Sequence, residues 1–142
     1  MRILLLEDIS GVRIHTKEIL EEFGHKVEDF KRIDIAKEFF SKNYNNIDCL
    51  VIDLNMDDEF LGEYIAESNG GEISGWVFLQ RFVYPVRPNI PTVIYSGLIE
   101  ELEDIIDKTL YKNIEFVSKT GVIDGGTDGL ISAINRLEKL EG

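Results

Sequence analysis

Basic residues are scarce in this sequence, where 15 lysines and arginines stand against 27 aspartates and glutamates. The resulting formal net charge is -12 and the isoelectric point is near 4.5. Such a balance disfavours a nucleic-acid partner, because binding a phosphate backbone requires a cationic face that displaces counterions. We therefore expect no direct nucleic-acid binding.

Long apolar runs and cysteines are also lacking. The start MRILLLEDIS reaches Glu7 and Asp8 after a run too short for the apolar core of a signal peptide, and no stretch approaches the length of a membrane span. This indicates a cytoplasmic protein without membrane insertion. The single cysteine, Cys49, has no partner for an internal disulfide, and its place in the apolar run CLVI favours a buried structural role.

The chain does contain enough apolar residues for one compact domain. It has 142 residues, 44% of them hydrophobic, which suits a single core and is too short for two ordinary domains. We therefore expect one domain over residues 1–142 and no output domain.

Five short runs have the character of β-strands. Ile3–Leu6, Cys49–Ile52 and Thr92–Tyr95 are almost wholly apolar, as in parallel strands that are buried on both faces. Lys26–Phe30 and Ile114–Val117 carry charges within equally short runs, which favours strands at the edges of a sheet.

Five helical patterns alternate with these runs. Four of them have an apolar face, formed by Val12, Ile19 and Phe23; by Ile33, Ala36 and Phe40; by Leu102, Ile105 and Ile106; and by Leu130, Ile134 and Leu137. A further helix is expected from Trp76 to Val83, ended by Pro85. The first helix is expected to begin after Ser10 and to end at Gly24. Strands and helices that alternate in this way predict an α/β fold, namely a doubly wound five-stranded parallel sheet flanked by five helices.

In such a sheet, ligands bind beyond the carboxyl ends of the strands. The residues expected there are Glu7, Asp8, Asp53, Ser96, Gly97 and Lys119, which bring three acids, a hydroxyl and an amine to one edge. Two carboxylates about 4 Å apart repel by roughly 4 kcal/mol at an effective dielectric near 20, so three of them require a cation or shared protons. Mg²⁺ meets this requirement, because it prefers hard oxygen ligands.

The motifs LLLEDISGVR, CLVIDLNM, TVIYSG and FVSKTG, in this order, resemble those of the receiver domain of two-component response regulators. The resemblance covers nearly the whole chain. The combination is specific, since an acidic pair, an aspartate, a serine followed by a small residue, and a lysine each come directly after an expected strand. It implies the flavodoxin-like receiver fold, with strand order 2-1-3-4-5.

The resemblance also implies roles for the acidic residues. Asp53 matches the phospho-acceptor, whose carboxylate takes a phosphoryl group from a phosphohistidine of a partner. Glu7 and Asp8 match the acidic pair that holds Mg²⁺ together with Asp53 and the backbone carbonyl of Asn55. For either acid alone, an ordinary loop acid that caps the first helix is an alternative explanation.

The remaining motif residues match groups that bind the phosphoryl oxygens or respond to them. Lys119 matches the amine that pairs with the phosphoryl group, Ser96 matches its hydroxyl donor, and Gly97 leaves room for it. Phe116 matches the aromatic switch residue, although an edge strand favours an aromatic side chain equally well. Thr120 departs from the proline that usually follows this lysine, which leaves the direction of Lys119 open.

These motifs predict a signalling receiver rather than an enzyme, one that catalyses only its own phosphorylation and dephosphorylation. Its partners would be a sensor histidine kinase or histidine phosphotransfer protein, and a downstream protein target. One alternative is a receiver-like interaction module that takes no phosphate. A second, a Mg²⁺-dependent phosphohydrolase or nuclease, is disfavoured because these enzymes commonly carry Asp-x-Asp where this chain reads Asp53-Leu54-Asn55.

One connection departs from the pattern, because an insertion of about residues 57–74 follows the third strand. It contains apolar residues at helical spacing, namely Phe60, Leu61, Tyr64 and Ile65, whereas Asn69-Gly70 would instead suit the turn of a hairpin. We expect the insertion to fold over or beside the phosphorylation pocket, to restrict which partner reaches it, and to favour a basic partner surface. The alternative is an acidic loop without a role.

Overall fold

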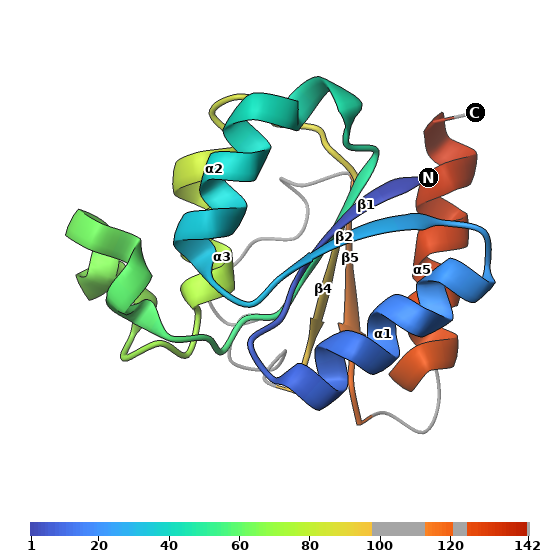
Figure 1. The fold of residues 1–142 in the computed structure, drawn as a ribbon, viewed down its shortest axis with the longest axis horizontal. Helices are drawn as coiled ribbons and strands as arrows, with labels where there is room; N and C mark the ends of the chain where they lie inside the picture. Colours follow the sequence, from blue (N-terminus) through green and yellow to red (C-terminus); the bar gives the residue numbers. More distant parts are fainter. Residues whose placement is uncertain (98–112, 121–124, 142) are drawn as a thin grey trace.

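The computed structural model describes residues 1–97, 113–120 and 125–141, and a five-stranded parallel sheet lies at its centre (Figure 1). The strands are β1 (Arg2–Leu6), β2 (Lys26–Phe30), β3 (Cys49–Ile52), β4 (Thr92–Ser96) and β5 (Ile114–Ser118). Their order is β2-β1-β3-β4-β5, and all neighbouring pairs are parallel. The expected doubly wound sheet and its strand order are confirmed.

Helices cover both faces of this sheet (Figure 1). One face carries α1 (Ser10–Glu22) and α5 (Gly126–Glu141), and the other carries α2 (Ile33–Asn43) and α3 (Ser74–Phe78), which continues through a π-helical turn (Leu79–Val83). The helix expected around Leu102 lies outside the described residues. Among the helices of the described part of the chain, none is long and apolar enough to cross a membrane.

The core is divided in two because successive strand residues point to opposite faces of the sheet. Leu4, Leu50 and Ile94 pack with α2 and α3, whereas Val51 and Val93 pack on the face of α1 and α5. All five side chains are buried, as expected for central parallel strands. Cys49 is likewise buried among the apolar residues, with the structural role that the sequence indicates.

The inner face of α1 differs from the predicted one. Thr16 and Leu20 are its buried residues, whereas Phe23, expected on this face, is 59% exposed. Phe23 is the C-cap residue, so it no longer follows the helical repeat. Gly24 ends the helix as predicted, with a positive φ of 89° that glycine adopts without strain.

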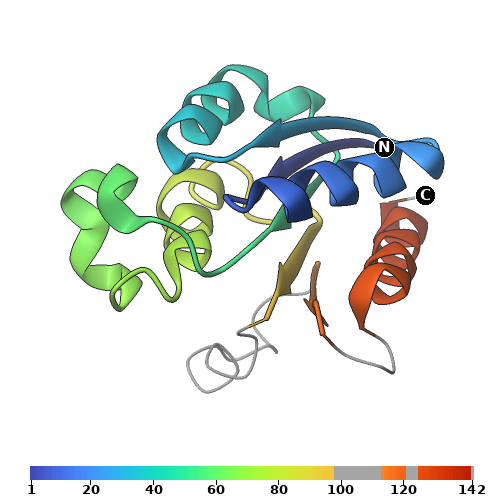
Figure 2. The ribbon, with the colours of Figure 1, turned by 60° about the horizontal axis from the view of Figure 1, so that its bottom comes forward.

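The insertion folds as two 3₁₀ helical segments within Asp58–Ser68, separated at Gly62, whose φ of 62° and ψ of -126° are not helical, and it packs beside α2 and α3 (Figure 2). The helix expected from the apolar spacing is confirmed, and the hairpin expected from Asn69-Gly70 is wrong. Asn69, with φ 52°, caps the helical segment, and the chain then continues into α3. Leu61 is buried in the core on this side of the sheet.

Aromatic side chains and two arginines hold the insertion in place. The guanidinium of Arg32 lies over the ring of Phe60 at 4.3 Å, and Tyr64 meets Phe82 edge-on with ring centroids 5.7 Å apart. Arg81 forms a bidentate pair with Glu67, at 2.9 and 2.7 Å. Because these contacts are partly exposed, the buried apolar contacts give most of the stability.

Candidate functional site

The register of the sheet brings two of the acids side by side. Leu6 of β1 is paired with Ile52 of β3, so Glu7 and Asp53, which follow them, leave the sheet next to each other. The N–H of Asp53 donates to the carbonyl of Leu6 at 3.0 Å and fixes this arrangement. Both acids are buried, with exposed fractions of 2% for Glu7 and 5% for Asp53.

Lys119 reaches the same place from the end of β5. Its Nζ contacts Oε1 of Glu7 and lies 3.3 Å from Oδ2 of Asp53. Its backbone N–H donates to the carbonyl of Ser96 at 3.1 Å, which ties the ends of β4 and β5 together. Lys119 therefore points into the acidic cluster although Thr120 follows it, and all peptide bonds of the described residues are trans.

Burial and mutual repulsion shift the titration of this cluster. Burial, followed by the hydrogen bond to Asp53 and its charge, raises the pKa of Glu7 to about 8. Burial and the charge of Asp53 also raise the pKa of Asp8. Burial acts to lower the pKa of Lys119, but the hydrogen bond with Glu7 and the charge of Asp53 outweigh it and raise this pKa.

The shift at Glu7 predicts an unusual dependence of stability on pH. Between the ordinary pKa of 4.5 and the folded value of about 8, the folded chain holds a proton that the unfolded chain has lost. The free energy of unfolding of the metal-free protein should therefore fall as pH rises from 5 toward 8. Urea unfolding in EDTA at several pH values measures this slope.

Glu7→Gln is the control for this slope, because it removes the titrating group and keeps a similar shape. Burial lowers the pKa of half-buried His25, so protonation of His25 favours the unfolded chain at low pH. This contribution makes the free energy of unfolding rise with pH, opposite to that of Glu7, and Glu7→Gln leaves it in place. A wild-type slope that Glu7→Gln does not flatten would contradict the assignment to Glu7.

The turn after β3 is held against the start of α3. Oδ1 of Asp53 accepts the N–H of Leu54 at 2.8 Å, and the carbonyl of Leu54 accepts the N–H of Gly75 at 3.0 Å. A Cβ on Gly75 would lie 1.8 Å from the carbonyl oxygen of Asp53 and 2.9 Å from Cγ2 of Ile52. Only glycine allows this approach, so Gly75 fixes the position of the acid-bearing turn.

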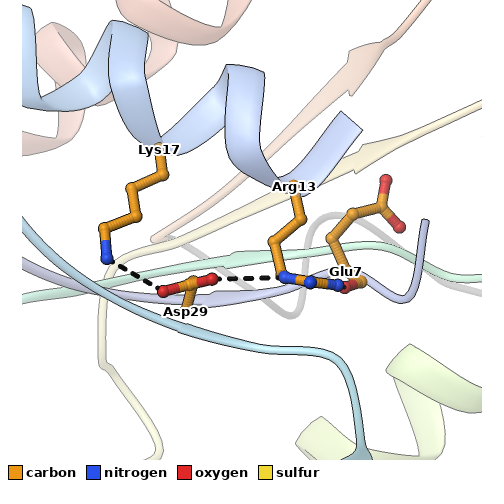
Figure 3. A network of polar contacts seen from close by, with 4 residues as sticks. All are labelled: Glu7, Arg13, Lys17 and Asp29. Carbon is orange, nitrogen blue, oxygen red and sulfur yellow. Dashed lines mark hydrogen bonds and ion pairs between the residues drawn. The ribbon is translucent and has the colours of Figure 1, made fainter. Parts of the chain in front are cut away.

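A second network fixes the other side of the site (Figure 3). Arg13 of α1 donates through Nε to Asp29 at 3.2 Å and through a terminal nitrogen to the carbonyl of Glu7 at 3.2 Å, while Lys17 donates to Asp29 at 3.0 Å. Burial acts to raise the pKa of Asp29, but the hydrogen bonds from Lys17 and Arg13 lower it overall. The network therefore links α1 and β2 to the backbone of Glu7.

The remaining expected site residues lie at or after the end of β4, on β5, and in the turn after β3. Ser96 is the last residue of β4 and is 1% exposed, whereas Gly97 is exposed and a Cβ built on it would meet no atom within 4 Å. Phe116 is half-buried in β5 and packs against the core cluster on the α2 and α3 side. Asn55 is exposed, in the turn between Asp53 and the insertion.

The donor set suits a hard divalent cation. Glu7, Asp8 and Asp53 each offer an oxygen, and these oxygens all lie within 4.8 Å of one another. Oε2 of Glu7 and Oδ1 of Asp8 are buried without a hydrogen-bond partner among the described residues, and unpaired oxygens of this kind are costly to bury. Mg²⁺ takes oxygen ligands and would satisfy them, so the residues present fit this ion.

Sequence searches with this chain find no matching family model and no matching curated protein. Solved structures do match. A response regulator receiver domain protein from Clostridium thermocellum has a TM-score of 0.69 at 21% identity, over 98% of both chains. A CheY-like receiver domain protein from Methanospirillum hungatei JF-1 has a TM-score of 0.66 at 17% identity, over 99% of this chain and 95% of its own.

The chain has the receiver-domain fold. A further neighbour with this fold is the response regulator TrrA from Thermotoga maritima, solved in complex with Mg²⁺ and BeF. It has a TM-score of 0.68 at 21% identity, over 96% of this chain and 97% of its own. The likeness extends over nearly the whole chain, and the resemblance seen in the sequence motifs is confirmed at the level of the fold.

Sequence reasoning overlooked two positioning features of this receiver fold. The role of Gly75 depends on a backbone approach to Asp53, a residue 22 positions earlier, and only the Ser74-Gly75 pair at the expected start of a helix hinted at it. The Arg13 and Lys17 side chains lie one helical turn apart and converge on Asp29. Their spacing in the sequence shows that Arg13 and Lys17 share one helix face. Only the structure shows that Asp29 of the neighbouring strand lies opposite that face.

Proposed function

We propose that this chain is a phospho-acceptor receiver, which takes a phosphoryl group from a phosphohistidine of a partner onto Asp53. The observation that carries the proposal is the convergence of Glu7, Asp8, Asp53 and Lys119 at the strand ends of a receiver fold. Three carboxylates around one amine form an unfavourable cluster by themselves, but they suit a site that binds a cation and a phosphoryl group.

Each side chain has a role in the transfer. An oxygen of Asp53 forms a bond to phosphorus as the bond between phosphorus and the histidine nitrogen breaks, and the leaving imidazole takes up a proton. The ammonium group of Lys119 neutralises charge on the phosphoryl oxygens, and the hydroxyl of Ser96 donates a hydrogen bond to them. Because the ammonium group of Lys119 already lies beside Asp53, it and the attacking carboxylate are in position before the phosphohistidine of the partner arrives.

Mg²⁺ would be held by Glu7, Asp8, Asp53 and the backbone carbonyl of Asn55. When bound, it supplies charge neutralisation for the phosphoryl oxygens and relieves the repulsion among the carboxylates. The proposed partners are a sensor histidine kinase or a histidine phosphotransfer protein, and a protein target that binds the phosphorylated form.

Labelling with a small phosphodonor tests the proposal. The protein is incubated with acetyl phosphate and Mg²⁺, and its intact mass is measured with and without EDTA. We expect one phosphoryl group per chain, lost in Asp53→Asn and in EDTA. No adduct on folded wild-type protein would instead support a phosphorylation-independent interaction module. Multiple-turnover hydrolysis of a phosphate ester that persists in Asp53→Asn would support a phosphohydrolase.

Phe116 is proposed as the residue that reports phosphorylation to a partner, together with Ser96. We expect that beryllofluoride with Mg²⁺ shifts the backbone amide signals of Phe116 and its neighbours in β5, because contacts of Ser96 with the phosphoryl mimic favour one of two states. Two-dimensional NMR spectra measure the shifts. Unchanged signals around Phe116, in a sample where the amide of Leu54 beside Asp53 does shift, would contradict the switch role.

A further inference from the structure

The end of the insertion is bonded to the turn that carries the proposed metal-ligating carbonyl. The N–H of Met56 donates to the carbonyl of Gly71, with an N···O distance of 3.2 Å. The hydroxyl of Ser74, a fully buried residue, lies 2.9 Å from the carbonyl oxygen of Met56 and 3.1 Å from that of Gly71. Both backbone polar groups of Met56 are therefore occupied by the insertion.

These bonds determine where the carbonyl of Asn55 points. The carbonyl of Asn55 and the N–H of Met56 belong to the same planar peptide group, in which they point in opposite directions. Because the N–H of Met56 is directed at the carbonyl of Gly71, the carbonyl of Asn55 points away from Gly71. The insertion thus orients this carbonyl through the neighbouring N–H of Met56.

The same end of the insertion is tied to its beginning. The hydroxyl of Ser68 accepts the N–H of Gly71 at 3.1 Å and lies 3.2 Å from Oδ2 of Asp58. Gly71 has a φ of 94°, and a Cβ there would lie 2.9 Å from the carbonyl oxygen of Met56. Only glycine allows this approach, so the contact between the insertion and the turn is close and specific.

We propose that the insertion is a positioning element of the Mg²⁺ site, with Ser74 as the positioning residue that holds the Asn55 carbonyl in its direction. This inference rests on the proposed function, because it assigns the carbonyl to the metal. It is separate from the expected restriction of partners by the insertion, which stays a prediction, because it is argued from the hydrogen bonds that connect the insertion to the turn after Asp53. The residues that orient metal ligands from outside commonly change metal affinity by about 10- to 100-fold when replaced.

Mg²⁺ affinity of a Ser74 variant tests this inference. Ser74→Ala removes the hydroxyl and should raise the dissociation constant for Mg²⁺ by about tenfold, measured by titration calorimetry on the full chain. Thr92→Val is the matched control, because Thr92 is also fully buried and its hydroxyl donates to the carbonyl of Ile90 at 3.0 Å. Thr92 begins β4, at the opposite end of the strands, so its loss should lower stability and leave Mg²⁺ affinity unchanged.

Equal Mg²⁺ affinity in wild-type protein and folded Ser74→Ala would overturn the inference, as would an equal loss of affinity in Thr92→Val. Ser74→Cys keeps a similar side-chain volume but replaces the hydroxyl with a weaker hydrogen-bond donor. If Ser74→Ala does not fold, the Mg²⁺ affinity of Ser74→Cys tests the inference. In Ser74→Cys we expect a smaller loss of affinity, and no loss would overturn the inference. The proposed function fails separately, if the wild-type chain itself binds no Mg²⁺ and takes no phosphoryl label.

Discussion

Asp53→Asn should make the metal-free protein more stable at pH 8, by about 1–3 kcal/mol, while it weakens Mg²⁺ binding. The charge of Asp53 and its hydrogen bond are among the causes that raise the pKa of Glu7, so removal of the charge relieves the cluster. An asparagine oxygen still accepts the N–H of Leu54, which lies 2.8 Å from Oδ1 in the wild type. Loss of the 3.3 Å pair with Lys119 offsets part of the gain, and Lys119 keeps its contact with Glu7.

Urea unfolding of both proteins at pH 5 and pH 8, in EDTA and in Mg²⁺, provides the measurement and its controls. At pH 5 Glu7 holds its proton, since its pKa is about 8, so the gain from Asp53→Asn should shrink. In Mg²⁺ the order should reverse, because the ion stabilises only the chain that binds it well. A variant less stable than the wild type at pH 8 in EDTA would show that the attraction between Asp53 and Lys119 exceeds the repulsion.

Gly75→Ala should have the largest destabilising effect, a loss of about 3 kcal/mol or more in the free energy of unfolding, together with loss of Mg²⁺ binding. A Cβ at Gly75 would lie 1.8 Å from the carbonyl oxygen of Asp53, so either α3 or the acid-bearing turn must move. The turn cannot move freely, because Leu54 accepts a hydrogen bond from the N–H of Gly75 itself.

Gly11→Ala provides the matched control for this effect. Gly11 also lies in the first turn of a helix, but a Cβ there would meet no atom within 4 Å. Alanine is favoured over glycine in a helix by about 0.5–1 kcal/mol, so this variant should be slightly more stable than the wild type. Equal losses in Gly75→Ala and Gly11→Ala, measured by urea unfolding, would show that the close approach at Gly75 is not the cause.

The sequence alone identified the sheet because its central strands are buried on both faces and its edge strands carry charged residues. The run Cys49–Ile52 coincides with β3, and Lys26–Phe30 with β2, the first as an apolar centre and the second as a charged edge. Turn chemistry was equally clear at Gly24. Periodicity was less reliable for α1, where the buried face includes the polar Thr16 and excludes Phe23 at the helix end.

The sequence also determined which acids meet, since residues that follow parallel strands share one edge of the sheet. This rule predicts that Glu7, Asp8 and Asp53 lie together, and in the structure Lys119 joins them although Thr120 follows it. Only the tertiary structure decided how the insertion folds. Its sequence left a short helix and a hairpin open, and its conformation depends on hydrogen bonds between Met56, Gly71 and Ser74. Contacts between residues so far apart in sequence arise from packing, and local pattern does not encode them.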